Sequence, residues 1–576
     1  MNSKNTCANT HDFLAAMNSE TLKLMELFGG KVGKEQLDNL NGDWTQVLGQ
    51  SHSTQDWIEV IGDYQKSQMK FWSGFFAAPI DASSASSASS DRRFNSDEWS
   101  ETPIFNYIKD SYLIASKQLN KLAASVGMDD KSQQTLAFYT QQYIDALSPS
   151  NFAATNPEVI QRAIDTNGQS LIDGLKNLVG DIGKGRISMT DESAFTMGEN
   201  IATSEGAVVF ENELMQLIQY TPSTDKVCER PLLIVPPCIN KFYILDLQPH
   251  NSFVRHAVEQ GQTVFLISWV NPAAKQGHLS WDDYVEKGIF EALSVAKAVT
   301  GSERVNTVAW CVGGTLLASA LAVMAARKDN SVASATLLTT LVDFEEPGDL
   351  GVFINKSQVL PLIKQAKESG VMSGKKLSVA FNLLRSNDLI WPYVVNNYLK
   401  GHAPAPFDIL YWNSDLTNMA GEMYSEYLTN MYLENNLIKP GKMTVCGDAL
   451  DLSQIKVPCY FLSCIEDHIA PWSSIFKGAG LFRNVEFVLG ASGHIAGVIN
   501  PASKNRRHFW TDGEKGNGSE HWLESAEKQE GSWWNHWSVW LDKRGGKRVP
   551  AAKQLGSCDF EVIEAAPGRY VKERIA

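Results

Sequence analysis

The second half of the chain alternates short, almost uninterrupted apolar runs with stretches that repeat apolar residues at helical spacing. The apolar runs are rich in β-branched residues, as is typical of strands that are buried on both faces. Such strands separated by helices indicate a parallel sheet covered on both sides. We therefore predict an α/β fold from about residue 205 onward, with strands at residues 231–235, 263–268, 305–310, 335–339, 459–463 and 485–489.

The stretch between the fourth and fifth of these strands, roughly residues 340–457, is too long for a simple crossover connection. We expect it to contain an inserted cap over the carboxyl edge of the sheet. The stretch is rich in aromatic side chains, which would help to keep water away from a site beneath it. These include Phe381, Trp391, Tyr393, Tyr398, Tyr411 and Trp412.

The first part of the chain has a different pattern. Residues 104–186 repeat apolar side chains at helical spacing, and strand signals are sparse there. Residues 82–90 consist only of Ala and Ser, which have little to bury and therefore predict a flexible linker. We expect two domains, a mostly helical N-terminal domain over residues 1–200 and a catalytic domain over residues 201–576.

The composition of the chain argues against several classes of protein. The net charge of −14 and the pI near 5.4 argue against a nucleic-acid binder, which needs a basic face. The sequence contains no run of about 20 apolar residues, so we predict no transmembrane helix. The polar N-terminus does not resemble a secretory signal. The eight cysteines form no tight framework, which favours reduced thiols. We therefore expect a cytoplasmic protein.

The segment with the clearest chemistry surrounds Cys311, where an apolar strand gives way to an apolar helix in Val308-Ala-Trp-Cys-Val-Gly-Gly-Thr315. This is the strand–elbow–helix context of the G-x-S-x-G motif of α/β-hydrolases, with cysteine in place of serine. The nucleophile of such a motif occupies a strained turn, so its neighbours must be small. Ala309 replaces the first glycine of the motif and is still small. The helix N-terminus behind Cys311 favours a thiolate.

Two later residues complete a candidate catalytic triad. Asp467 follows the strand at residues 459–463, and His494 lies in a glycine-rich loop after the strand at residues 485–489. The order nucleophile, acid, histidine, with each residue at its own strand-to-loop junction, is that of α/β-hydrolase triads. We therefore predict an α/β-hydrolase-like catalytic domain with Cys311, Asp467 and His494 as its catalytic residues.

Several alternatives stay open at this point. Cys311 can also be read as a buried structural cysteine packed between strand and helix. Asp343 follows the fourth predicted strand and is an alternative acid, whereas His468 is assigned a supporting role beside Asp467. A metal site at Cys464 and His468 lacks further ligands at suitable spacing, so we expect no metal.

Other residues are candidates for substrate contacts. The backbone N–H of Val312 is suited to donate to an oxyanion, and a second donor is expected from Ile239 or Asn240 in the loop after the first predicted strand. Asn240 is also a candidate for substrate binding. The basic residues Lys504, Arg506 and Arg507 follow His494 and are candidates for contacting phosphate groups, although a solvated charge run is the alternative.

An ordered set of segments makes the chain resemble the polyhydroxyalkanoate synthases. The resemblance covers most of the chain except about the first 80 residues, and Ala309 and Cys238 depart from the expected pattern. The segments are Asp91-Arg-Arg-Phe94 with Trp99, Ser148-Pro-Ser-Asn-Phe152, Thr155-Asn-Pro157, Pro236-Pro-Cys-Ile-Asn-Lys-Phe-Tyr-Ile244, the Cys311 elbow, Tyr411-Trp-Asn-Ser-Asp-Leu-Thr-Asn418, Glu466-Asp-His-Ile469, Ser492-Gly-His-Ile-Ala-Gly497, Gly531-Ser-Trp-Trp534 and Ala566-Pro-Gly-Arg-Tyr-Val571.

The resemblance implies an acyltransferase of the single-subunit type that needs no cofactor. It would transfer (R)-3-hydroxyacyl groups from CoA to a growing polyester and work as a homodimer at the surface of cytoplasmic polyester granules. The resemblance assigns catalysis to the same three residues, Cys311, Asp467 and His494. A thioesterase or polyester depolymerase on the same scaffold is the alternative, as is a catalytically degenerate granule-associated scaffold protein.

Overall fold

The computed structural model describes residues 91–575, and the Ala/Ser run predicted as a linker at residues 82–90 lies outside them. The chain divides into two compact units. One unit ends at Asp191 but also takes in Val379–Ala405, and the other comprises Glu192–Ser378 and Pro406–Ala576. The segment 379–405 comes from the middle of the predicted cap and is nevertheless part of the first unit.

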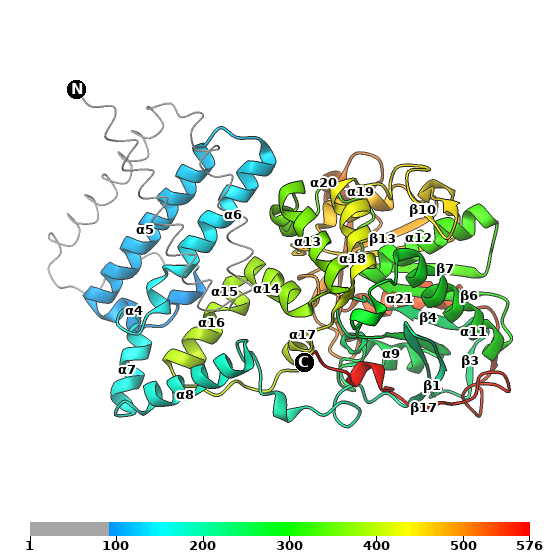
Figure 1. Cartoon of the computed structure of the whole chain (residues 1–576), viewed down its shortest axis with the longest axis horizontal. Coiled ribbons are helices and arrows are strands. Elements are labelled where there is room, and N and C mark those ends of the chain that lie inside the picture. The colour runs from blue at the N-terminus through cyan, green and yellow to red at the C-terminus, as the bar shows by residue number, and fades with distance from the viewer. Residues whose placement is uncertain (1–90, 576) are drawn as a thin grey trace. The chain divides into compact units, whose positions relative to one another are not determined.

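The described part of the first unit is almost entirely helical, as predicted, and its helices α5 and α6 lie side by side (Figure 1). Side chains that accept backbone N–H groups mark where helices begin: Asp129 caps α6, and Asn156 caps α7. The helices are η1 (Arg92–Phe94), α4 (Glu98–Glu101), α5 (Pro103–Ser125), α6 (Asp130–Ala146), η2 (Pro149–Asn151), α7 (Pro157–Asp165) and α8 (Gln169–Lys184).

Segment 379–405 is attached to this unit by buried polar contacts. The Tyr398 hydroxyl donates to Asp181 at 2.7 Å, and the Asn397 amide donates to the carbonyl oxygen of Ser188 at 2.7 Å. Such bonds are costly to break because the buried groups would lose their partners. The segment contains α15 (Ser386–Leu389), α16 (Trp391–Tyr393) and η8 (Val394–Leu399).

The second unit is built on an 11-stranded sheet, and all six predicted strands are confirmed in it. These six strands are neighbours and run parallel, in the order β13, β12, β7, β6, β4, β5. Their carboxyl ends therefore meet at one edge of the sheet, which is where active sites of such folds lie. The strands are β4 (Leu232–Val235), β5 (Val264–Trp269), β6 (Val305–Trp310), β7 (Val332–Leu338), β12 (Cys459–Cys464) and β13 (Val485–Gly490).

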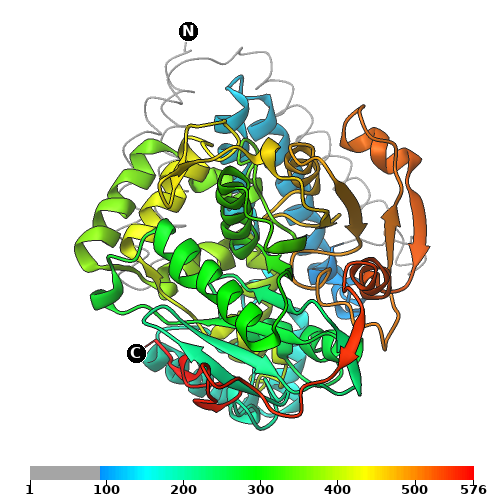
Figure 2. The ribbon, with the colours of Figure 1, turned by 90° about the vertical axis from the view of Figure 1, so that its right-hand side faces the viewer.

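Antiparallel strands extend the sheet on both sides and were not predicted. β14 (His508–Thr511) and β15 (Glu527–Glu530), drawn in orange in Figure 2, form one edge. The other side is formed by β2 (Met215–Tyr220), β1 (Gly206–Glu211) and β17 (Glu564–Ala565). Three two-stranded sheets complete the set: β3 (Lys226–Cys228) with β16 (Arg548–Pro550), β8 (Val371–Met372) with β9 (Met419–Ala420), and β10 (Thr444–Val445) with β11 (Asp448–Ala449).

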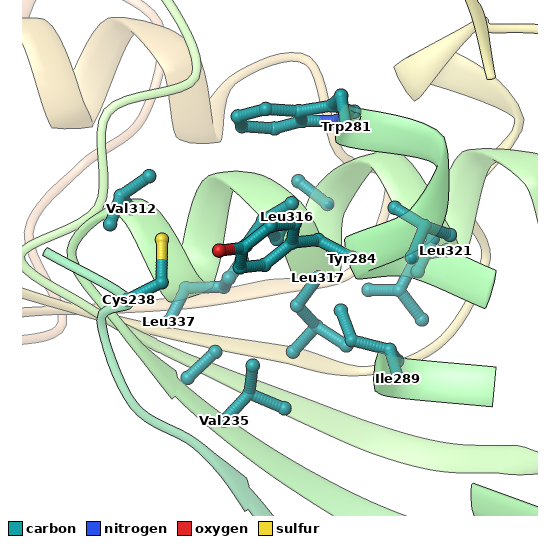
Figure 3. Packing of buried hydrophobic residues seen from close by; sticks show 14 of the residues in the cluster. Val235, Cys238, Trp281, Tyr284, Ile289, Val312, Leu316, Leu317, Leu321 and Leu337 are labelled. Carbon is teal, nitrogen blue, oxygen red and sulfur yellow. The ribbon is translucent and has the colours of Figure 1, made fainter. Parts of the chain in front are cut away.

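Each face of the sheet carries its own apolar core, because successive strand residues point to opposite faces. In β4, Leu233 and Val235 belong to one core, part of which is shown in Figure 3, and Leu232 and Ile234 belong to the other. The helix α21 contributes four buried tryptophans to the second core, Trp533, Trp534, Trp537 and Trp540. The main helices on the two faces are α9 (Phe253–Glu259), α11 (Glu291–Thr300), α12 (Val312–Arg327), α19 (Trp472–Ala479) and α21 (Trp533–Asp542).

The connection between β7 and β12 is mostly helical, and its remaining elements are short. In the part of the chain that the structure describes, none of the helices combines the length and the apolar character needed to span a membrane. The elements of this connection are η7 (Gly348–Phe353), α13 (Lys356–Ser369), α14 (Gly374–Leu384), α17 (Asp408–Ser414), α18 (Gly421–Tyr427), the π-helix η9 (Leu428–Leu433) and η10 (Leu452–Gln454). Elsewhere in the second unit lie η3 (Glu192–Ala194), η4 (Phe242–Asp246), η5 (Ala274–Gln276), α10 (Trp281–Asp283), the π-helix η6 (Tyr284–Phe290), α20 (Ser519–Ser525) and η11 (Tyr570–Lys572).

Candidate active site

Cys311 forms a sharp turn between β6, which ends at Trp310, and α12, which begins at Val312. Its backbone has φ 52° and ψ −127°, a conformation that an L-residue other than glycine rarely adopts. The Cys311 N–H donates to the carbonyl oxygen of Leu338 at 3.0 Å, which ties the turn to the end of β7. The side chain is half-buried, so the structure has the strained elbow that the sequence predicts for a nucleophile.

The residues that follow the elbow are small because neighbouring atoms leave no room for a side chain. A Cβ added at Gly313 would lie 2.6 Å from the carbonyl oxygens of both Val235 and Pro236, and one added at Gly314 would lie 1.9 Å from Oγ1 of Thr340. These separations are below van der Waals contact, so helix α12 approaches its neighbours only because it begins with two glycines.

Asp467 and His494 lie beyond the ends of the adjacent parallel strands β12 and β13 and contact each other directly. Asp467 Oδ2 is 2.7 Å from His494 Nδ1, and both residues are buried. The other carboxylate oxygen, Oδ1, accepts the backbone N–H groups of Ile469 and Ala470, each at 2.9 Å. The carboxylate is therefore held in one orientation, and the histidine ring is oriented by it.

The electrostatics of the site favour a charged His494. Burial disfavours the imidazolium, but the carboxylate of Asp467 and the Cys311 side chain outweigh burial and raise the pKa of His494 to about 10. A hydrogen bond between His494 and the Cys311 side chain contributes to this increase. The indole of Trp310 lies beside the imidazole with 6.3 Å between ring centroids. The structure thus brings together the three residues that the sequence singled out.

The alternative acid does not face His494. Both oxygens of Asp343 have other partners: Oδ1 accepts the Asn435 amide at 2.8 Å, and Oδ2 lies 3.4 Å from the Lys477 ammonium. His468 is half-buried, and its carbonyl oxygen accepts the backbone N–H of Asp349 at 2.9 Å. Within residues 91–575, no group of three or more His, Cys, Asp and Glu side chains has a geometry that could hold a metal ion.

The loop after β4 lies beside the elbow, as its predicted role requires. β4 and β6 are neighbouring parallel strands with Val235 opposite Ala309, so the loop that begins at Pro236 follows the same edge as Cys311. Figure 3 shows Cys238 of this loop close to Val312, with the Tyr284 hydroxyl turned toward the sulfur. Val312 is the first residue of α12, so its N–H has no partner within the helix.

The predicted substrate-binding residues occupy different surroundings. Asn240 pairs with Leu416 in an isolated β-bridge and lines a small pocket with Lys241, Ser268, Trp269 and Thr417, which does not include the three catalytic candidates. The basic residues Lys504, Arg506 and Arg507 are all exposed in the loop that follows the His494 segment. Of these, Arg507 donates to the carbonyl oxygen of Ala496, which anchors it beside the histidine loop.

Sequence reasoning missed two tyrosines that interact with Cys311. Tyr427 and Tyr432 have ring centroids 5.3 Å apart, and burial together with nearby groups that include Cys311 raises the pKa of each phenol. Tyr427 also stacks on Trp281 with 5.7 Å between centroids. No motif marks these tyrosines, and their only signal in the sequence is the aromatic content of the predicted cap. Of the cap aromatics named from the sequence, Phe381, Trp391, Tyr393 and Tyr398 belong to the first unit instead.

Comparisons with known proteins agree with this architecture. Residues 90–257 match the family model described as the poly-beta-hydroxybutyrate polymerase (PhaC) N-terminus, and residues 231–501 match the alpha/beta hydrolase fold model. A curated relative from Cupriavidus necator, poly(3-hydroxyalkanoate) polymerase subunit PhaC, is 47% identical over 523 residues, which cover 89% of this chain and 88% of the relative.

Two further relatives give the same picture. The poly(3-hydroxyalkanoate) polymerase subunit PhaC of Rhizobium etli is 46% identical, over 84% of this chain and 77% of the relative. The poly(3-hydroxyalkanoate) polymerase of Methylorubrum extorquens is 44% identical, over 84% of this chain and 80% of the relative. Because these identities extend over most of each chain, the protein belongs to the poly(3-hydroxyalkanoate) polymerase family, and its candidate nucleophile Cys311 lies on an α/β-hydrolase fold.

Proposed function

We propose that the protein polymerises (R)-3-hydroxyacyl groups from CoA thioesters into a polyester, with Cys311 as the covalent nucleophile. The observation that carries this proposal is the combination of a strained cysteine elbow with a buried histidine that is 2.7 Å from an aspartate. The membership of the chain in the polymerase family supports acyl transfer as the reaction.

In the first step, His494 already holds the proton of the Cys311 thiol as an imidazolium, and the Cys311 thiolate attacks the carbonyl carbon of the CoA thioester. The negative charge that forms on the carbonyl oxygen is stabilised by the backbone N–H of Val312 and by a second N–H from Ile239 or Asn240. The bond to the CoA sulfur then breaks, and His494 returns the proton to the departing thiol. One thioester is exchanged for another, so the acyl group stays activated.

In the second step, the 3-hydroxyl group of another acyl unit attacks the Cys311 thioester. His494 removes the hydroxyl proton, the new C–O bond forms, the C–S bond breaks, and His494 keeps the proton beside the restored Cys311 thiolate. Asp467 acts through His494, because both of its oxygens already accept hydrogen bonds, one from the histidine and the other from the backbone. The product is an oxygen ester.

Water has to be excluded from the acyl-enzyme, which would otherwise hydrolyse. We propose that the part of residues 340–457 that belongs to the second unit serves as the cap for this purpose. Tyr427, which is buried, and Tyr432, which is half-buried, support this role, since they come from that stretch and interact electrostatically with Cys311.

The broader organisation is proposed on the family resemblance. We expect a homodimer that works at the surface of polyester granules in the cytoplasm, and a helical domain of residues 1–200 ahead of the catalytic domain of residues 201–576. Sedimentation of the purified protein with and without polyester particles would test the homodimer and its association with the granule surface. A monomer that stays in solution would contradict them.

A thioesterase or depolymerase would use the same three side chains and transfer the acyl group to water. A degenerate scaffold protein would need no ordered triad. No feature of the site favours either alternative, and the relatives that match over most of the chain are polymerases by name.

The acyl-enzyme is the intermediate to look for. The protein is mixed briefly with 3-hydroxybutyryl-CoA, quenched with acid and digested, and the peptide that contains Cys311 is analysed by mass spectrometry. We expect a thioester-linked 3-hydroxybutyryl group on Cys311, and none in Cys311→Ala. An acyl group on another residue, or CoA release that is unchanged in Cys311→Ala, would reject the nucleophile.

A further inference from the structure

Lys241 closes the loop that follows β4 and carries a buried ammonium group. Its Nζ lies 3.3 Å from Oδ1 of Asp415, and the two side chains are only 4% and 3% exposed. The ammonium also donates to the carbonyl oxygen of Val571 at 2.7 Å and to that of Glu573. One lysine therefore joins the loop to the end of α17 and to the C-terminal residues, which lie next to each other in Figure 1.

Further contacts make this junction specific. The Tyr243 hydroxyl donates to Oδ2 of Asp415 at 3.0 Å, and the Trp412 indole donates to the carbonyl oxygen of Lys241 at 2.7 Å. The β-bridge between Asn240 and Leu416 runs alongside these bonds. The same short stretch of loop is thus fixed by a side-chain ion pair, by a backbone acceptor and by a strand-like pairing.

Stability alone does not explain this ion pair. Burial lowers the pKa of Lys241 and raises that of Asp415, and each partner only opposes the effect of burial on the other. A buried ion pair is often no more stabilising than well-packed apolar side chains of the same volume. What such a pair does provide is one defined geometry, because neither charge tolerates separation from the other.

The residues that this geometry fixes are the candidate oxyanion donors. At the start of the loop, the carbonyl oxygen of Pro236 accepts the Trp269 indole at 2.9 Å and packs against Gly313 of the elbow helix. At its end stands Lys241. Ile239 and Asn240 therefore lie between two anchored points, and prolines at positions 236 and 237 restrict the backbone further.

We propose that Lys241 and Asp415 are positioning residues that hold the 236–240 loop so that a backbone N–H of Ile239 or Asn240 points at the carbonyl oxygen of the reacting thioester. The backbone carbonyl oxygens of Val571 and Glu573 complete the arrangement by accepting hydrogen bonds from the Lys241 ammonium group. The inference rests on the proposed acyl transfer at Cys311. It predicts that disturbing the pair slows steps that form an oxyanion without weakening the binding of the CoA substrate.

The test compares two reactions of the same sulfur. Acylation of Cys311 by 3-hydroxybutyryl-CoA passes through an oxyanion, whereas alkylation of Cys311 by iodoacetamide does not. The variant is Lys241→Met with Asp415→Leu, which removes both charges together and leaves neither one buried alone. The control variant Lys287→Met breaks two ion pairs outside the loop, those of Lys287 with Glu213 at 2.9 Å and with Asp283 at 3.0 Å.

We expect single-turnover acylation in the double variant to slow by roughly 10–100-fold, less than or comparable to the loss of one oxyanion donor. Its alkylation rate should stay within about twofold of the unchanged protein, since the thiol and its histidine are untouched. The KM for the CoA substrate should not rise, and the control variant should match the unchanged protein in both reactions.

Equal losses of acylation and alkylation would overturn the proposal, because they would indicate general damage to the site. Unchanged acylation would also overturn it. If the double variant does not fold, Tyr243→Phe removes only the hydroxyl that bonds to Asp415. This variant should slow acylation by a smaller factor and leave alkylation unchanged. An acylation rate equal to that of the unchanged protein would overturn the proposal. Failure of the unchanged protein to acylate at all would instead reject the proposed function.

Discussion

Oδ2 of Asp467 lies 2.7 Å from Nδ1 of His494 in a part of the molecule that solvent hardly reaches. This contact has two consequences. It occupies Nδ1 and so leaves the other ring nitrogen, Nε2, for Cys311, and it keeps a proton on the ring through electrostatic attraction. Most of the chemistry proposed for the site depends on these two effects.

The protonation of His494 can be measured directly. Burial acts against the charged ring, yet Asp467 and the Cys311 side chain raise the pKa to about 10. In Asp467→Asn the main opposing attraction is lost, so the pKa of His494 should fall well below that in the unchanged protein. NMR titration of protein labelled with carbon-13 at histidine Cε1 would show both values, with His494→Asn used to assign the signal. A titration midpoint that does not move would refute the assigned partner.

The same interaction makes stability depend on pH. The folded-state pKa of His494 lies above its ordinary value of 6.5, so the folded chain retains a proton that the unfolded chain releases. The stabilisation is complete below pH 6.5 and is lost as the pH rises through about 10. Asp467→Asn should therefore lower the free energy of unfolding more at pH 6 than at pH 10, as denaturant titrations at the two pH values would show. An equal loss at both pH values would contradict this linkage.

The elbow at Cys311 stores backbone strain that a substitution can release. With φ at 52° and ψ at −127°, a residue with a Cβ costs about 1–3 kcal/mol relative to a relaxed conformation. Glycine escapes this cost but loses roughly 0.4–1 kcal/mol through the greater freedom of the unfolded chain. Cys311→Gly should therefore be more stable than Cys311→Ala by about 1 kcal/mol in chemical denaturation. A less stable glycine variant would show that the turn is not strained.

Gly313 tests the closeness of the elbow helix to the candidate oxyanion loop. An added Cβ would lie 2.6 Å from two backbone oxygens, those of Val235 and Pro236, which cannot rotate away. Gly313→Ala should displace the loop, destabilise the fold by about 1–3 kcal/mol, and slow acylation of Cys311. Gly183→Ala in α8 is a matched control, because a Cβ there meets nothing within 4 Å. Full activity in Gly313→Ala would mean that the loop position is not critical.

The exposed basic loop gives a prediction about CoA. Lys504 and Arg506 are solvent-exposed in the loop that follows the His494 segment, so they are available to phosphate groups of the substrate. Charge reversal of both residues should raise the KM for 3-hydroxybutyryl-CoA several-fold at low salt, with little change in kcat, as steady-state kinetics would show. An unchanged KM would identify the cluster as an ordinary solvated charge run. Arg507 is left intact because it holds the carbonyl of Ala496.

The residues that could be predicted from sequence are those whose signal is local. The six parallel strands are continuous apolar runs, and Cys311, Asp467 and His494 each follow such a run directly. The edge strand β15 has the sequence Glu-Lys-Gln-Glu and carries no apolar signal, so its pairing depends on β14 rather than on its own composition. Pattern reasoning recognises strands that bury both faces far better than strands at an edge.

Contacts between distant segments could not be predicted. Lys241 donates a hydrogen bond to the carbonyl oxygen of Val571, which is 330 residues away in sequence. No pattern in either segment predicts this contact. The same holds for the approach of Tyr427 and Tyr432 to Cys311, and for residues 379–405, which join the helical unit through buried bonds such as Tyr398 to Asp181. Such contacts follow from the tertiary fold and not from local propensity.

The most direct test of the central claim follows both products of the reaction in one tube. Purified protein is supplied with 3-hydroxybutyryl-CoA, thiol release is recorded, and the acyl group is recovered as insoluble polymer or as soluble acid. We predict thiol release accompanied by insoluble polyester, with both abolished in Cys311→Ala. Thiol release that yields only soluble 3-hydroxybutyrate would contradict the claim and would assign the same fold and catalytic residues to a hydrolase.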